Sequence, residues 1–107
     1  MADKIIALAC AGGMSTSLLA KKMMDAAKLQ GKDYEISANG TSVAQTLLNV
    51  TPKPDVLLLG PQVAYLKAEL KKMADEAGVP LDVINMRDYG MMRGDKVLAQ
   101  AEKLMGI

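Results

Sequence analysis

The sequence predicts an α/β domain with an open four-stranded parallel sheet, strand order 2-1-3-4, and helices on both faces. Two short runs, Ile5 to Ala9 and Val56 to Leu59, are apolar throughout, as in strands buried at the centre of a parallel sheet. Between the strands, apolar residues recur at the spacing of amphipathic helices. Alternating strands and helices predict right-handed crossovers, with the two apolar strands as central neighbours.

The first half of the chain is expected to form a helix, an edge strand and a second helix. Apolar periodicity predicts the first helix over about 16–29. Residues 34–38 alternate like a strand that is covered on one side, and we expect a turn at Asn39-Gly40. Thr41 or Ser42 is the expected cap of a short helix, whose inward residues are Val43, Ala44, Leu47 and Leu48.

The second half of the chain is also expected to alternate between strands and helices. The strand over 56–59 stops at Gly60-Pro61, and the proline suits the first turn of a helix. Helical spacing then runs over 63–77 and ends at Gly78. A fourth strand is expected over 81–85. Residues 87–94 are expected to form a loop, after which Asp95 caps a last helix with Val97, Leu98, Ala101, Leu104 and Met105 facing inward.

Length and composition narrow the function classes. The 107 residues predict one domain, residues 1–107, whose core relies on nine Met because Phe and Trp are absent. A net charge of +1 without a basic stripe argues against nucleic-acid binding. One Cys and no His argue against a disulfide, a metal site or a cofactor, and favour a reducing cytosol. Without a leader or an apolar run of ~20 residues, no membrane insertion is expected.

The expected site is the loop after the first strand. Cys10 lies at the carboxyl end of that strand, where sites of such sheets form. The loop allows several amides to point inward and the hydroxyl residues suit a helix start, so the segment favours an anion and a reactive thiolate at Cys10. Its members are Ala11, Gly12, Gly13, Met14, Ser15, Thr16 and Ser17.

The expected strand order places further residues near Cys10. Gly60, Pro61 and Gln62 follow the neighbouring strand, and residues 87–92 approach from the next loop. For several side chains the sequence leaves two roles open. Ser15, Thr16 and Ser17 either donate hydroxyls to an anion or only cap the helix. Tyr65 and Tyr89 either approach the site or are interior tyrosines bonded to backbone. Met91 and Met92 either ring the site or fill the core.

Missing motifs indicate what the site does not do. Neither the phosphate-binding Gly-x-x-x-x-Gly-Lys-Ser/Thr pattern nor the dinucleotide Gly-x-Gly-x-x-Gly pattern occurs. In cysteine phosphatases an arginine follows the nucleophile after five residues, whereas Thr16 stands there, and no histidine can act as base. Asp88 is interpreted as a solvated carboxylate rather than a general acid.

The site is therefore suited to accepting a phosphoryl group and transferring it to another molecule. A phosphatase, an arsenate reductase (which would need further cysteines) and a non-catalytic anion-binding module remain alternatives.

Three segments resemble a known family. Cys10 to Leu19, Leu58 to Tyr65 and Tyr89-Gly90 are similar to the lactose/cellobiose-type IIB components of the bacterial sugar phosphotransferase system, over essentially the whole chain. The free-standing cellobiose or chitobiose form agrees best in length. The resemblance implies a fold similar to low-molecular-weight tyrosine phosphatases. It also implies that Cys10 takes a phosphoryl group from a histidine of the IIA component and gives it to a sugar on the membrane IIC component, with residues 11–17 as the phosphate loop of a cytoplasmic protein.

Overall fold

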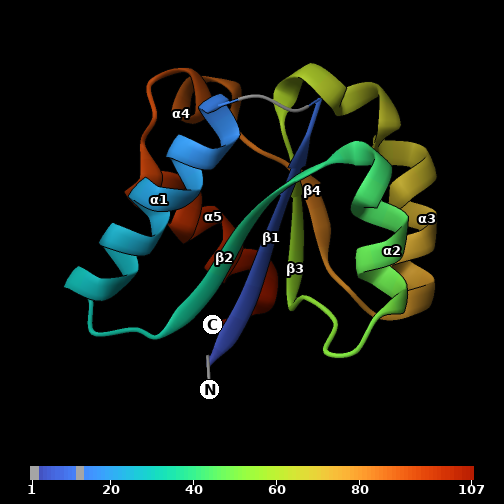
Figure 1. Ribbon diagram of the computed structural model, residues 1–107, viewed down its shortest axis with the longest axis horizontal. Helices are drawn as coiled ribbons and strands as arrows, with labels where there is room; N and C mark the ends of the chain where they lie inside the picture. Colours follow the sequence, from blue (N-terminus) through green and yellow to red (C-terminus); the bar gives the residue numbers. More distant parts are fainter. Residues whose placement is uncertain (1–2, 12–13) are drawn as a thin grey trace.

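The computed structural model describes residues 3–11 and 14–107, and the side chains of all of these except Met14 and Ser15. One sheet of four parallel strands has the order β2-β1-β3-β4, which confirms the predicted order (Figure 1). Because β1 pairs with β2 on one side and β3 on the other, it lies inside the sheet, while β2 and β4 are the edge strands. The strands are β1 (Lys4–Cys10), β2 (Tyr34–Gly40), β3 (Val56–Leu59) and β4 (Leu81–Val83).

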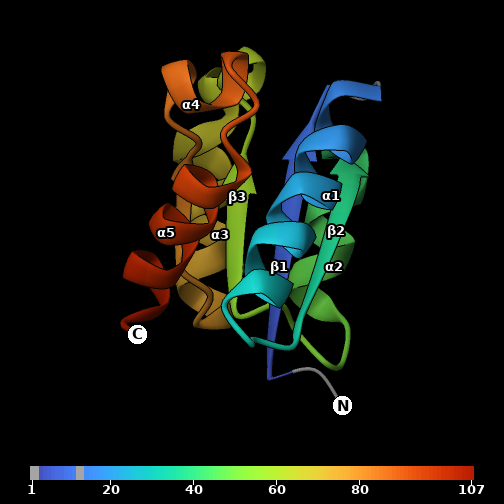
Figure 2. The ribbon, with the colours of Figure 1, turned by 90° about the vertical axis from the view of Figure 1, so that its left-hand side faces the viewer.

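Helices cover both faces of the sheet (Figures 1 and 2). One face carries α1 (Met14–Leu29), α4 (Met86–Gly90) and α5 (Gly94–Met105). The other carries α2 (Ala44–Asn49) and α3 (Lys67–Ala77), each preceded by a short 3₁₀ helix, η1 (Thr41–Val43) or η2 (Pro61–Leu66). Gly78 ends α3 as predicted, in a left-handed conformation with φ of 76°.

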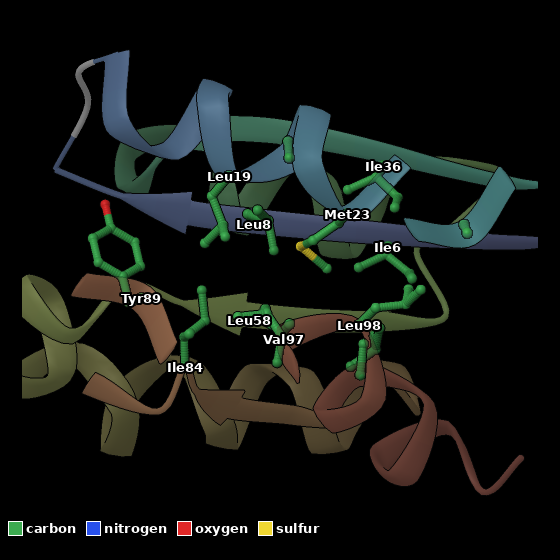
Figure 3. Close-up of a cluster of buried hydrophobic side chains, with 14 residues drawn as sticks. Ile6, Leu8, Leu19, Met23, Ile36, Leu58, Ile84, Tyr89, Val97 and Leu98 are labelled. Carbon is green, nitrogen blue, oxygen red and sulfur yellow. The ribbon is translucent and has the colours of Figure 1, made fainter. Parts of the chain in front are cut away.

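The side chains of β1 alternate between the two helical layers. Ile6 and Leu8 belong to the core under α1 and α5, whereas Ala7 and Ala9 belong to the core under α2 and α3. Figure 3 shows the first core, with Leu8 of β1 among side chains from α1, α4 and α5. Both faces of β1 are therefore buried from Ile6 onwards, which explains why the strand is apolar after Lys4.

Two predicted boundaries in the first half are wrong. Asn39 and Gly40 do not form a turn but continue β2, where they pair with Ala9 and Cys10. The Asn39 amide also donates to the Leu8 carbonyl at 3.2 Å, so the edge strand stays attached to β1. Neither Thr41 nor Ser42 caps α2, because η1 precedes it and its N-cap position is Val43 without a side-chain bond.

Three predictions near the carboxyl terminus also need correction. The expected loop over 87–94 is largely helical, because Asn85 caps α4 by accepting hydrogen bonds from the backbone of Arg87 and Asp88. The strand expected over 81–85 consequently stops at Val83. Asp95 lies in the first turn of α5 and not at its N-cap position, which is Arg93.

Gly94 fixes the distance between α5 and α1. A Cβ atom at this buried position would lie 2.6 Å from the backbone carbonyl carbon of Lys22, in the middle of α1. The two helices can approach this closely only because Gly94 has no side chain. By contrast, a Cβ atom at Gly90, four residues earlier, would have no atom of the described part of the chain within 4 Å.

We expect Gly94→Ala to lower the free energy of unfolding by about 2–3 kcal/mol, since backbone atoms must move to admit the methyl group. Gly90→Ala is the matched control and should change it by less than about 1 kcal/mol in either direction. Urea denaturation followed by circular dichroism measures both. Equal effects of the two substitutions would contradict the close packing at Gly94.

A partly buried polar cluster joins α5 to the edge strand β2. Glu102 accepts hydrogen bonds from the Lys32 ammonium group and, at 2.8 Å, from the Tyr34 hydroxyl. Burial alone would raise the pKa of Glu102, but the hydrogen bonds from Lys32 and Tyr34 and the charge of Lys32 lower it below its usual value. Burial, together with the hydrogen bond to Glu102 and its charge, raises the pKa of Tyr34 to about 12.

Glu102→Gln should lower the free energy of unfolding at pH 7 by about 1 kcal/mol. Because the folded pKa of Glu102 is depressed, its contribution is present above the ordinary value of 4.5 and is lost as the pH falls through the folded pKa. The difference between wild type and variant should therefore shrink below pH 4.5 in urea titrations. A difference that stays constant on acidification would rule out the charged form of Glu102 as its source, and the exposed Glu35→Gln serves as control.

Candidate functional site

The carboxyl ends of the parallel strands bring separate segments to one edge of the sheet. At this edge β1 ends with Cys10, which pairs with Gly40 at the end of β2. Gly60 follows β3, and its backbone N–H donates to the Ala9 carbonyl at 2.8 Å. The amino-terminal ends of α1 and α4 lie at the same edge (Figure 1). The predicted meeting of the Cys10 and Gly60 segments is therefore confirmed.

The Cys10 thiol faces the layer formed by α1 and α4. Its position continues the alternation of Ile6 and Leu8, and only 2% of the residue is exposed. The sulfur is hydrogen-bonded to the hydroxyl group of Thr16, the third residue of α1, which is itself 3% exposed. The Thr16 hydroxyl therefore contacts the thiol directly and does more than cap the helix.

A second hydroxyl group extends this contact. The phenol oxygen of Tyr89, on α4, lies 3.1 Å from the Thr16 hydroxyl oxygen and forms a buried hydrogen bond with it. Tyr89 is 7% exposed, and its ring packs in the core under α1 and α5. Of the two roles left open for Tyr89, the structure supports proximity to the site, through a side-chain partner.

Gly60 borders Cys10 from the side of β3. A Cβ atom at Gly60 would lie 2.8 Å from the Cys10 Cβ and 2.7 Å from the Gln62 side-chain oxygen. Gln62 therefore folds back over Gly60 beside Cys10, as the strand order predicts. Pro61 is half-buried and begins η2.

Other predicted residues have different surroundings. Ala11 and Ser17 are exposed, while Gly12 and Gly13 and the side chains of Met14 and Ser15 lie outside the described residues. Tyr65 is 78% exposed, so its interpretation as an interior tyrosine is wrong.

The two methionines for which the sequence left two roles open differ, because Met91 is 61% exposed whereas Met92 packs against the core. Asp88 is half-buried on α4, a helix rather than a loop.

Asn85 is a residue that the sequence analysis missed. Its side chain starts α4, and its carbonyl accepts the backbone N–H of Tyr89 at 2.9 Å, so it holds the segment that carries the phenol. Asn85 follows the end of β4 by two residues, and an asparagine in such a place is a helix-start signal, which the short length of α4 concealed.

The electrostatics of the site favour an anion. The first four backbone N–H groups of α1 have no acceptor within the helix, and the helix dipole places partial positive charge at this end. The first turn of α1 contains no acidic residue. Among the residues that the structure describes, no cluster of His, Cys, Asp or Glu is arranged to hold a metal ion. Nor is any helix in this part long and apolar enough to cross a membrane.

Comparison with known proteins gives a consistent result. Residues 5–100 match the family described as "PTS system, Lactose/Cellobiose specific IIB subunit". The chain is 67% identical over 107 residues to the galactose-specific EIIB component of Lactococcus lactis subsp. cremoris strain MG1363, covering 98% of this chain and 99% of that protein. It is equally similar, with the same coverage, to the cellobiose-specific EIIB component of Lactococcus lactis subsp. lactis strain IL1403.

A solved structure agrees with these relatives. The solution structure of the cellobiose-specific phosphotransferase IIB component from Borrelia burgdorferi superimposes with a TM-score of 0.77 at 33% identity, covering 96% of this chain and 92% of the other. The sheet order, the extent of the family match and these similarities therefore agree. This chain belongs to the lactose/cellobiose-specific IIB subunits of the sugar phosphotransferase system, which are phosphotransferases of sugar uptake.

Proposed function

We propose that Cys10 is the phosphoryl carrier of this IIB subunit. In the first half-reaction its thiolate attacks the phosphorus of a phosphohistidine on the IIA component, the P–N bond breaks and an S–P bond forms. In the second, a hydroxyl oxygen of a sugar bound to the membrane IIC component attacks the phosphorus. An O–P bond forms, the S–P bond breaks, Cys10 leaves as a thiolate and the hydroxyl proton is released. The observation that carries this proposal is the bond between Cys10 and Thr16 at the amino-terminal end of α1.

Transfer of this kind requires an aligned attacking atom and stabilisation of the charge on the phosphoryl oxygens. The sheet supplies the first, because Cys10 is anchored by pairing on β1 and bordered by Gly60. The amino-terminal end of α1 supports the second through its first N–H groups, which have no acceptor within the helix. We therefore propose that residues 11–17 bind the phosphoryl group, with Gly60, Pro61 and Gln62 at the opposite rim.

Both partners must approach the same edge of the sheet, because one sulfur serves the histidine of IIA and the sugar on IIC. Exposed apolar side chains at this edge are suited to such contacts, namely Tyr65 of η2, Met86 of α4 and Met91 directly after α4. Flexible methionines can adapt to two differently shaped surfaces. The proposed location is the cytoplasm, with the 107 residues acting as a single domain.

The sugar is the least constrained part of the proposal. Two relatives of equal identity carry different sugars in their names, galactose and cellobiose. This supports the proposal that IIC, where the sugar binds, determines which sugar is phosphorylated. By family, a cellobiose- or chitobiose-like disaccharide is the proposed acceptor.

Incubation with phosphorylated IIA should add the mass of one phosphoryl group to the protein, and peptide mapping should place it on Cys10. Cys10→Ser should remain unmodified, because an un-ionised hydroxyl without a nearby base is a poor nucleophile. A phosphorylated Cys10→Ser protein would overturn the proposal. Rapid hydrolysis of p-nitrophenyl phosphate by the wild type would instead favour the phosphatase alternative, and retention of phosphate only without a covalent bond would favour an anion-binding module.

Gly60→Ala should slow phosphoryl acceptance from IIA by about tenfold or more, because its methyl group displaces Cys10 or Gln62 from the positions described above. The matched control is Gly40→Ala on the other neighbour of Cys10. Among the described residues, a methyl group there meets only the Ser42 hydroxyl oxygen, at an ordinary 3.8 Å. Intact mass recorded over time gives both rates, at a temperature where circular dichroism shows both variants folded. Equal rates for the two variants would refute the role of Gly60 in placing Cys10.

A further inference from the structure

We propose that Tyr89 is a positioning residue that acts on Cys10 through Thr16, by directing the Thr16 hydroxyl proton to the sulfur. This inference rests on the proposed role of Cys10 as the phosphoryl carrier. The three groups form one buried chain, in which the Thr16 hydroxyl oxygen is bonded both to the Cys10 sulfur and to the Tyr89 phenol.

In the reactive state, the number of protons available decides which group is the donor in each of these two hydrogen bonds. A thiolate carries no proton and can only accept hydrogen bonds. The Thr16 hydroxyl has a single proton, which it must then donate to the sulfur. In its bond to Tyr89 the same hydroxyl can therefore only accept, and the proton of that bond comes from the phenol. The order is Tyr89 to Thr16 to Cys10.

The fold holds Tyr89 in place for this role. Its ring is packed in the core with Leu19 and Ile84, and Figure 3 shows its hydroxyl oxygen directed towards the carboxyl end of β1. The Asn85 cap and the bond from the Tyr89 N–H to the Asn85 carbonyl hold the backbone. A phenylalanine would fill the same space, so packing alone does not require the hydroxyl group.

The phenol matters because the Thr16 hydroxyl group can rotate about its C–O bond. Its proton therefore has other orientations besides the one that points at the Cys10 sulfur. A donor at Tyr89 occupies one lone pair of the Thr16 oxygen and favours the rotamer that points the proton at the sulfur. Negative charge returns to this sulfur when the phosphoryl group departs, so the same bond stabilises Cys10 as the leaving group.

The test measures the ultraviolet absorbance of the Cys10 thiolate, which needs neither IIA nor IIC. Each variant is compared with the same variant carrying Cys10→Ser, at the pH where half of the wild-type thiol is ionised. Tyr89→Phe should lower the ratio of thiolate to thiol roughly threefold, and Thr16→Val roughly tenfold, as expected for loss of a hydrogen bond to a charged group. Thr16→Ser keeps the hydroxyl and should restore most of the ratio.

A double variant separates positioning from a general structural effect. If Tyr89 acts through Thr16, adding Tyr89→Phe to Thr16→Val should leave the ratio of Thr16→Val unchanged. Tyr34→Phe is the matched control, because it also loses a bonded hydroxyl but at the far end of β2, next to Lys4, and should leave the ratio at the wild-type value.

Two results would overturn the inference. One is an unchanged ratio in Tyr89→Phe, and the other is the same decrease in both the wild-type and the Thr16→Val backgrounds. Either result leaves the carrier role of Cys10 intact if the phosphorylated mass is observed. Conversely, failure to observe that mass would remove the proposed function without changing the absorbance ratios.

Discussion

The pairing of β1 on both of its sides is the constraint on which the site depends. Cys10 is the last residue of this strand, so the strands that pair with β1 decide which backbone segments border Cys10 within the sheet. Both segments that reach it, the end of β2 and the residue after β3, present a glycine, Gly40 or Gly60. At Gly60 any side chain would enter the space of Cys10, so the lack of a Cβ there is a requirement of the site.

The parts of the fold that follow from strong sequence patterns could be predicted. The apolar runs in β1 and β3 identify the two central strands, and parallel pairing then brings Cys10 and Gly60 together without further information. The failures have a common physical origin, because they concern short segments whose structure depends on distant partners. Asn39-Gly40 has the composition of a turn but is held in β2 by β1. The five residues of α4 are too few to show helical periodicity, and only the cap at Asn85 signals them.

The side-chain contacts of the site could not be predicted for a different reason. Successive residues of a helix are turned by about 100° from one another, so which of three consecutive hydroxyl residues meets Cys10 depends on where α1 begins. The helix was expected from about residue 16 and begins at Met14. The structure shows Thr16 bonded to Cys10, and it adds Tyr89, which is 73 residues away in the chain and reaches Thr16 only because α4 packs beside α1.

The alternation of side chains along β1 limits how the segment before Cys10 can vary. Ile6, Leu8 and Cys10 share one face of the sheet, and Ala7 and Ala9 share the other. Inserting or deleting a single residue ahead of Cys10 would turn its thiol towards α2 and α3, away from the two hydroxyl groups, and would exchange the small and large side chains of the two cores. Length changes in this strand that preserve function should therefore occur in pairs, even though nearly every residue type in it is apolar.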